Sequence, residues 1–133
     1  MSEFLFAYGT LQPGLAPEQV ADVVRELASV GKGSVPGTLY DLGSFPGAVL
    51  ESSSSRRISG TVYRLPAGAD ILPRLDEYEE YYPESPKASQ FIRRLCPVQL
   101  TDGRMMECWV YEYNGRRDRA PILESGAYIR DSP

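Results

Sequence analysis

The sequence lacks histidine altogether and has only two cysteines, Cys96 and Cys108, among its 133 residues. Without imidazole, Ser-His-Asp and Cys-His catalysis, histidine-based zinc sites and histidine proton shuttles are excluded. Two cysteines cannot complete a structural zinc site, and in a cytoplasmic protein they are most often reduced core residues. The sequence therefore offers no metal site built from histidine and cysteine. Carboxylates, tyrosines, lysines, thiols and backbone dipoles are left to carry the chemistry.

Long apolar runs and an excess of positive charge are also missing. No stretch of eighteen or more apolar residues occurs, and the start, Met-Ser-Glu, lacks the basic and apolar parts of a signal peptide. We therefore expect a cytoplasmic protein with no membrane partner. The net charge is −4, from 14 basic and 18 acidic residues spread along the chain, so no basic stripe is present to follow a phosphate backbone. We expect no nucleic-acid partner.

The length and the apolar content predict how the chain is divided. A chain of 133 residues with 42% apolar residues suits one domain with one core. We expect residues 1–133 to form this single domain. Within it, residues 116–133 are expected to form an irregular C-terminal tail, because they are polar apart from two short apolar pairs.

The segment that follows the first apolar run is a candidate binding loop. The run from Phe4 to Tyr8 predicts a strand buried on both faces. Gly9, at its carboxyl end, permits a sharp turn and the close approach of another molecule, because glycine has no Cβ. The backbone N–H groups beyond the strand must find partners or be offered to a ligand. The candidate loop consists of Tyr8, Gly9, Thr10 and Leu11. An ordinary strand-to-helix connection is the alternative.

Hydrophobic spacing and capping residues predict two helices. The first is expected from Pro17 to Val30, where apolar residues recur with the spacing of an amphipathic helix. The second is expected from Ile71 to about Tyr81. Asp70 is its predicted N-cap, because its carboxylate can accept hydrogen bonds from the first-turn amides.

Short apolar and β-branched runs predict five further strands, at residues 38–42, 47–50, 58–65, 91–100 and 104–113. Gly60, in the third of these, is expected to mark a bulge or a tight barrel corner. Thr101-Asp102-Gly103 is a hairpin signal, so the last two strands should pair antiparallel. A three-residue loop would set Cys96 directly opposite Cys108, whereas a two-residue loop would displace them by one.

One acidic residue of the second helix falls on its apolar side. At about 100° per residue, Glu79 projects between Leu72 and Leu75. The apolar side itself is predicted to consist of Ile71, Leu72, Leu75, Tyr78 and Tyr82. The other acidic residues, Asp76, Glu77 and Glu80, are expected to face water or the rim.

A buried carboxylate is costly, and desolvation raises its pKa toward the range used in general acid/base chemistry. Glu79 is therefore the best catalytic candidate in the sequence. Two alternatives remain open. Glu79 could form a structural ion pair with Arg93 or Arg94, or the helix could end before it.

Taken together, these segments resemble the γ-glutamylcyclotransferase-like family, also called AIG2-like, over nearly the whole chain. The resemblance is carried by Tyr8-Gly9-Thr10-Leu11, Gly37-Thr38-Leu39-Tyr40-Asp41-Leu42-Gly43 with Phe45-Pro46-Gly47, Gly60-Thr61-Val62-Tyr63, Leu75-Asp76-Glu77-Tyr78-Glu79 and Trp109-Val110-Tyr111. It implies an α+β fold, a small closed mixed β-barrel of about six strands with two or more flanking helices.

The resemblance also implies an activity. Enzymes of this family release 5-oxoproline from γ-glutamyl amines or amides, when the substrate's own α-amine attacks its γ-carbonyl. In them the residue that matches Glu79 acts as general base and acid, and the loop that matches Tyr8 to Leu11 binds the γ-glutamyl group. A small-molecule γ-glutamyl substrate is the implied partner. Because the nucleophile belongs to the substrate, the resemblance implies no metal and no cofactor. The alternatives are a non-catalytic protein of the same fold that binds a small carboxylate, and a protein-interaction domain.

Overall fold

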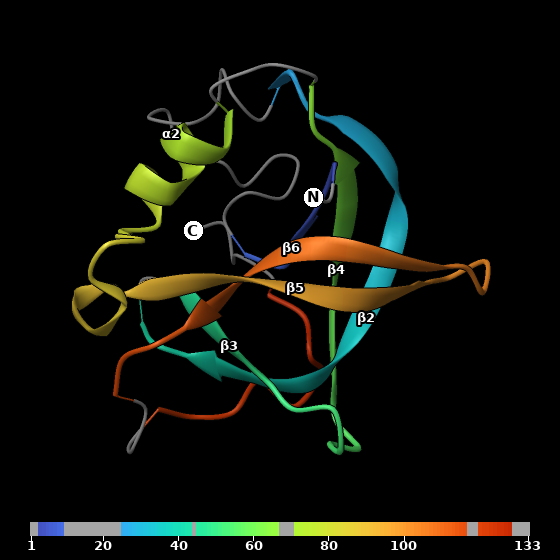
Figure 1. Ribbon diagram of the computed structural model, residues 1–133. Coiled ribbons are helices and arrows are strands. Elements are labelled where there is room, and N and C mark those ends of the chain that lie inside the picture. Colours follow the sequence, from blue (N-terminus) through green and yellow to red (C-terminus); the bar gives the residue numbers. More distant parts are fainter. Residues whose placement is uncertain (1–2, 10–24, 44, 67–70, 117–119, 129–133) are drawn as a thin grey trace, which may run out of the picture.

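The computed structural model describes residues 3–9, 25–43, 45–66, 71–116 and 120–128. These residues contain six β-strands, one complete α-helix and one short 3₁₀ helix. The elements are β1 (Phe4–Ala7), β2 (Ala28–Asp41), β3 (Pro46–Leu50), β4 (Arg57–Arg64), α2 (Ile71–Tyr78), η1 (Pro86–Ala88), β5 (Phe91–Leu100) and β6 (Met105–Tyr113). Figure 1 shows the strands wrapped around a common centre, with α2 to one side.

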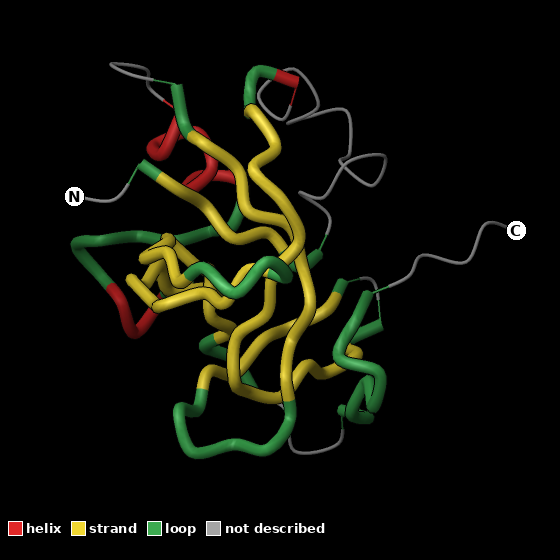
Figure 2. The backbone as a smooth tube through the Cα atoms, turned by 90° about the vertical axis from the view of Figure 1, so that its right-hand side faces the viewer, coloured by secondary structure: helices red, strands yellow, loops and turns green. Residues whose placement is uncertain are grey.

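Five of the strands form a closed mixed barrel. The strand order is β3-β2-β4-β1-β6-β5, and β2 also pairs with β5, which closes the ring. The pairing of β1 with β6 is parallel, and the other strand pairs are antiparallel. The remaining strand, β3, is not part of this ring and pairs antiparallel with residues 37–41 of β2. Figure 2 shows the strands from the side, curling around one interior. The predicted small mixed barrel is confirmed.

The first strand is buried on both faces, as its apolar run predicts. Alternate residues of a barrel strand face inward and outward. Phe6, 1% exposed, belongs to the cluster that fills the barrel. Leu5 and Ala7 belong to a second cluster, which lies between the outer face of the barrel and α2 and includes Ile71 and Leu75. The end of β1 therefore lies between two cores.

Two element boundaries differ from the prediction. Residues 28–30, expected in the first helix, belong to β2. Ala28 and Ser29 pair with β4, and the register shifts between Ser29 and Gly31. Most of that predicted helix, and the Asp70 cap, lie outside the described residues. Helix α2 ends at Tyr78 and not at about Tyr81. Tyr82, predicted on the apolar side, is 46% exposed because the helix has already ended. Among the residues described, α2 is thus the one complete flanking helix where two or more were expected.

The hairpin of β5 and β6 has the register that a three-residue loop predicts. Cys96 lies directly opposite Cys108, and both are free thiols. Gly103 supplies the positive φ that the turn requires, at +94°. Gly60 marks no bulge, because its register with β2 is continuous. A Cβ there would lie 2.3 Å from the Ala7 carbonyl oxygen, so the close passage of β1 requires glycine.

Residues 120–128 lie against the barrel without forming a regular element. Ile122 makes an isolated bridge to Tyr40, and the Leu123 N–H donates to the Leu39 carbonyl oxygen at 2.8 Å. No helix in the described part of the chain is both long enough and apolar enough to span a membrane.

Candidate active site

A cavity of about 310 Å³ lies where the end of β1 meets the end of α2 and the beginning of β5. Aromatic, small and acidic side chains share its lining. The lining residues are Phe6, Ala7, Tyr8, Gly9, Phe45, Pro46, Tyr78, Glu79, Glu80, Gln90, Phe91 and Tyr111. The cavity therefore joins the candidate loop to the candidate carboxylate, two features that lie far apart in the sequence.

The way in which α2 ends brings Glu79 to this cavity. The Tyr81 N–H donates to the Asp76 carbonyl oxygen at 2.8 Å, and the Glu80 N–H donates to that of Glu77 at 3.2 Å. Glu80 itself has a φ of +54°. These bonds and this left-handed residue define a Schellman motif, in which Glu79 is the C-cap. The alternative that the helix ends before Glu79 is therefore correct, because α2 ends at Tyr78 and Glu79 reaches the cavity as the C-cap.

The Glu79 carboxylate has no partner among the described residues: no hydrogen bond or ion pair from this part of the chain reaches it. Burial raises the pKa of Glu79 from its ordinary value of 4.5 to about 8. Burial first, and the charge of Glu79 second, raise the pKa of Tyr8, so its phenol stays neutral. Glu79 can therefore exchange a proton near neutral pH.

The two arginines considered as partners of Glu79 pair elsewhere. Arg93 donates from Nε and Nη2 to the Asp76 carboxylate, at 2.9 and 3.2 Å. Arg94 donates to Glu112. The ion-pair alternative for Glu79 is therefore not the arrangement that the structure shows among these residues.

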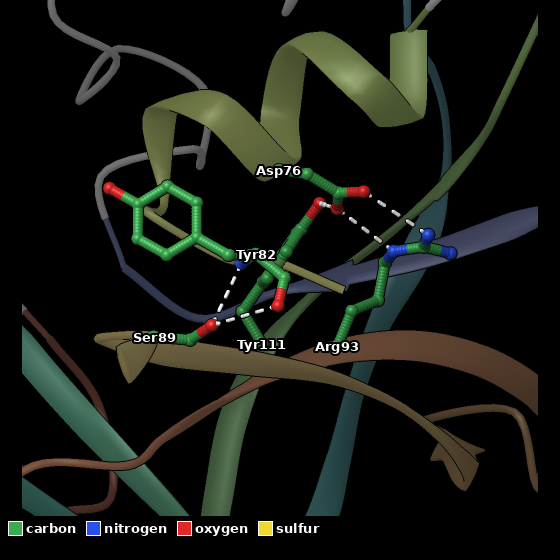
Figure 3. A network of polar contacts seen from close by, with 5 residues as sticks. All are labelled: Asp76, Tyr82, Ser89, Arg93 and Tyr111. Atoms are coloured by element: carbon green, nitrogen blue, oxygen red, sulfur yellow. Dashed lines mark hydrogen bonds and ion pairs between the residues drawn. The ribbon is translucent and has the colours of Figure 1, made fainter. Parts of the chain in front are cut away.

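The prediction that Asp76 faces water or the rim is wrong. Asp76 is 8% exposed and also accepts a hydrogen bond from the Tyr111 hydroxyl at 2.6 Å. Figure 3 shows Asp76 pointing from α2 toward Arg93 and Tyr111 on the strands below. Arg93 and Tyr111 are direct neighbours in the β5–β6 register, so together they offer a carboxylate three donors. These three hydrogen bonds satisfy the buried Asp76 carboxylate.

The described part of the candidate loop lies at the cavity. The Tyr8 ring lines it, while its hydroxyl donates to the Tyr111 carbonyl oxygen and accepts from the Ala48 N–H at 3.3 Å. Tyr8 thus ties the end of β1 to β6 and β3. A Cβ on Gly9 would lie 3.0 Å from Cγ of Pro46, so the absence of a side chain permits this close approach. Thr10 and Leu11 lie outside the described residues.

Aromatic side chains form a wall that the local sequence patterns do not predict. Phe45 and Phe91 line the cavity, and Tyr113 packs against both. The three ring centroids lie 5.4 to 6.2 Å apart, at the tilted and edge-on angles that favour aromatic contact. The signals for this wall were the match of Phe45-Pro46-Gly47 to the family and the aromatic-x-Arg element Phe91-Ile92-Arg93.

The segment between α2 and β5 closes one side of the cavity. Its two ends are joined by the Gln90 N–H, which donates to the Glu80 carbonyl oxygen at 3.0 Å. The Ser89 hydroxyl accepts from the Tyr82 N–H at 2.8 Å and donates to the Tyr82 carbonyl oxygen at 3.3 Å (Figure 3). These bonds hold Gln90 in the lining of the cavity that Glu79 and Glu80 also line.

Comparison with known proteins gives a consistent result. A family model described as gamma-glutamyl cyclotransferase, AIG2-like, matches residues 5–130. The gamma-L-glutamyl-butirosin B gamma-glutamyl cyclotransferase of Niallia circulans is 33% identical over 112 residues, 83% of this chain and 66% of that protein, just under two thirds.

Solved structures share the fold. An AIG2-like protein from Mus musculus has a TM-score of 0.75 at 20% identity, covering 98% of this chain and 90% of that one. Protein ytfP from Escherichia coli has a TM-score of 0.64 at 25% identity, covering 95% and 96%. With the family match over nearly its whole length, the chain belongs to the AIG2-like γ-glutamyl cyclotransferase family.

Proposed function

We propose that the protein is a γ-glutamyl cyclotransferase that releases 5-oxoproline from a γ-glutamyl amine or amide, with Glu79 as general base and acid. The observation that carries the proposal is a carboxylate at the wall of a partly enclosed cavity, with no partner among the described residues and a pKa of about 8. Family membership supports the same reaction.

The pKa of Glu79 suits the proton that has to move. The α-amino group of a peptide chain has a pKa of about 7.7 to 8.0, so a carboxylate with a pKa of about 8 is far better matched to a substrate α-ammonium than an ordinary glutamate is. The freed amine attacks the γ-carbonyl carbon and closes a five-membered lactam. Glu79 then returns the proton to the leaving nitrogen as the original amide bond breaks, and the ring nitrogen releases its second proton to solvent to become the lactam N–H. The products are 5-oxoproline and the free amine.

The rest of the cavity supplies binding. The nucleophile belongs to the substrate, so the protein has to hold the α-amine and the γ-carbonyl close together. In this proposal the backbone amides of Gly9, Thr10 and Leu11 hold the γ-glutamyl group and stabilise the oxyanion. Phe45 and Phe91 supply apolar contact beside it.

The test is an assay of 5-oxoproline by mass spectrometry after incubation with γ-glutamyl amines and γ-glutamyl amino acids. On a substrate that reacts, Glu79→Gln should reduce turnover by about 10² to 10⁴-fold, because the amide cannot accept and return a proton. Substrate binding should persist. Glu77→Gln, at an exposed position of the same helix, is the matched control and should remain active.

A folded Glu79→Gln protein with normal turnover would refute the role of Glu79. If no compound yields 5-oxoproline but a thermal-shift screen shows that some of them bind, the non-catalytic binding protein becomes the better interpretation.

A further inference from the structure

Arg93, on the outer face of the barrel, is held by Asp76 and by the rings of Trp109 and Tyr81. Arg93 makes two bonds to Asp76, a planar fork that matches the carboxylate. Its Cζ also lies 4.4 Å from the centre of the Trp109 ring. The Arg93 and Asp76 side chains are only 17% and 11% exposed. The guanidinium is therefore fixed in one orientation.

Tyr111 stands between this ion pair and the cavity. It lines the cavity, and its hydroxyl donates to Asp76. Burial, then the bond to Asp76, raises the pKa of Tyr111, and the charges of both Glu79 and Arg93 act on it as well. The Glu79 carboxylate and the Arg93 guanidinium thus both act on the same phenol.

Asp76 and Glu79 are three residues apart, so they leave α2 in neighbouring directions. Asp76 reaches the strands, and Glu79 reaches the cavity. An arginine freed from Asp76 would have Glu79 as the next carboxylate on the same helix face. Such a pair would lower the pKa of Glu79 by about 1 to 3 and weaken it as a base at neutral pH.

We propose that Asp76 is a positioning residue for Glu79: it binds the Arg93 guanidinium and the Tyr111 hydroxyl, and so keeps both from pairing with the Glu79 carboxylate. This inference rests on the proposed function only in that Glu79 is the acid and base. The arrangement explains why a buried aspartate and arginine accompany a carboxylate that has no partner among the described residues.

The decisive variant is Asp76→Asn, which keeps the shape of the side chain but removes the charge that holds Arg93. The acidic limb of the pH profile of kcat/KM should move to lower pH by about 1 to 3 pH units, and kcat should fall with KM nearly unchanged. The double variant Asp76→Asn, Arg93→Met removes the freed cation and should return the limb to its wild-type position.

Two further variants separate positioning from stability. Asp76→Glu keeps a carboxylate opposite Arg93 and should retain the wild-type profile, and it serves also if Asp76→Asn does not fold. A limb that moves down in Asp76→Glu would overturn the inference. Glu77→Gln removes one negative charge from an exposed position of the same helix and should leave the profile unchanged.

A measurement without substrate tests the inference apart from the proposed function. Glutamate carboxyl carbons labelled with ¹³C can be titrated by NMR, with Glu79 assigned from the spectrum of Glu79→Gln. The Glu79 resonance should titrate about 1 to 3 pH units lower in Asp76→Asn than in the wild type. An unchanged titration in folded Asp76→Asn overturns the inference, whether or not any γ-glutamyl compound is turned over.

Discussion

Glu79 makes the stability of the folded protein depend on pH. Burial raises its pKa from 4.5 to about 8, so the folded chain binds this proton more tightly than the unfolded chain does. The stabilisation from this proton is complete below pH 4.5 and is lost as the pH rises through about 8. The direction is opposite to that of a carboxylate in an ion pair.

Glu79→Gln should remove this dependence, because the amide stays neutral at every pH. The free energy of unfolding of the variant, relative to the wild type, should rise between pH 4.5 and about 8. The slope for one group is at most about 1.4 kcal/mol per pH unit. Urea denaturation of both proteins across this range measures it. A constant difference would contradict the raised pKa, and Glu77→Gln provides the flat reference.

The sequence predicts on which side of the helix Glu79 lies, but it does not predict the residues around it. Both results have the same physical cause. Helical periodicity is local, and it places Glu79 on the side of Leu72 and Leu75. The partners that bury Asp76 are 17 and 35 residues further along the chain, so the helix alone contains no sign of them. The aromatic wall of Phe45, Phe91 and Tyr113 likewise depends on chain segments that meet only in the folded barrel.

The end of α2 carries a conformational cost at Glu80. A residue with a Cβ at a φ of +54° costs about 1 to 2 kcal/mol in the left-handed region, and most helices of this type place glycine there. The Schellman bonds hold Glu80 in this conformation. Glu80, which has this unfavourable φ, directly follows Glu79 and lines the same cavity.

Glu80→Gly should therefore stabilise the fold by about 1 kcal/mol, since glycine adopts a positive φ freely. Glu80→Ala is the matched control, because it removes the carboxylate but keeps the Cβ. The midpoints of urea denaturation of the three proteins compare them. Equal effects of glycine and alanine would show that the charge, and not the backbone, sets the stability at this position.

The strands differ in how well the sequence predicts them. β5 and β6 are predicted to within one residue, because their β-branched and aromatic runs flank a clear Asp102-Gly103 turn. β2 is predicted only near its end. Its first residues continue a helix-like spacing, and pairing with β4 decides their conformation. Such pairing joins distant parts of the chain, so propensity cannot reveal it.

The sheet of the whole molecule is built around β2, because this strand pairs with three others, β3, β4 and β5. Only two residue pairs, Gly33 with Leu100 and Ser34 with Gln99, close the barrel between β2 and β5. A Cβ on Gly33 would lie 2.9 Å from a methyl carbon of Val98 and 3.0 Å from the Gln99 carbonyl oxygen. Closure therefore requires glycine at position 33.

This narrow closure has a consequence for the order of folding events. The β5–β6 hairpin joins segments that are neighbours in the sequence. The pairing of Gly33 with Leu100 closes a long loop, and we expect the loss of chain entropy that this closure requires to come late in folding.

Gly33→Ala should destabilise the fold by about 1 to 3 kcal/mol and should act mainly on the unfolding rate in stopped-flow measurements. Gly31→Ala, where a Cβ meets nothing within 4 Å, is the reference on the same strand. A Gly33→Ala protein that folds slowly but unfolds at the wild-type rate would place closure before the transition state. With the opposite result, the β2–β5 seam is the last contact to form and the first to open.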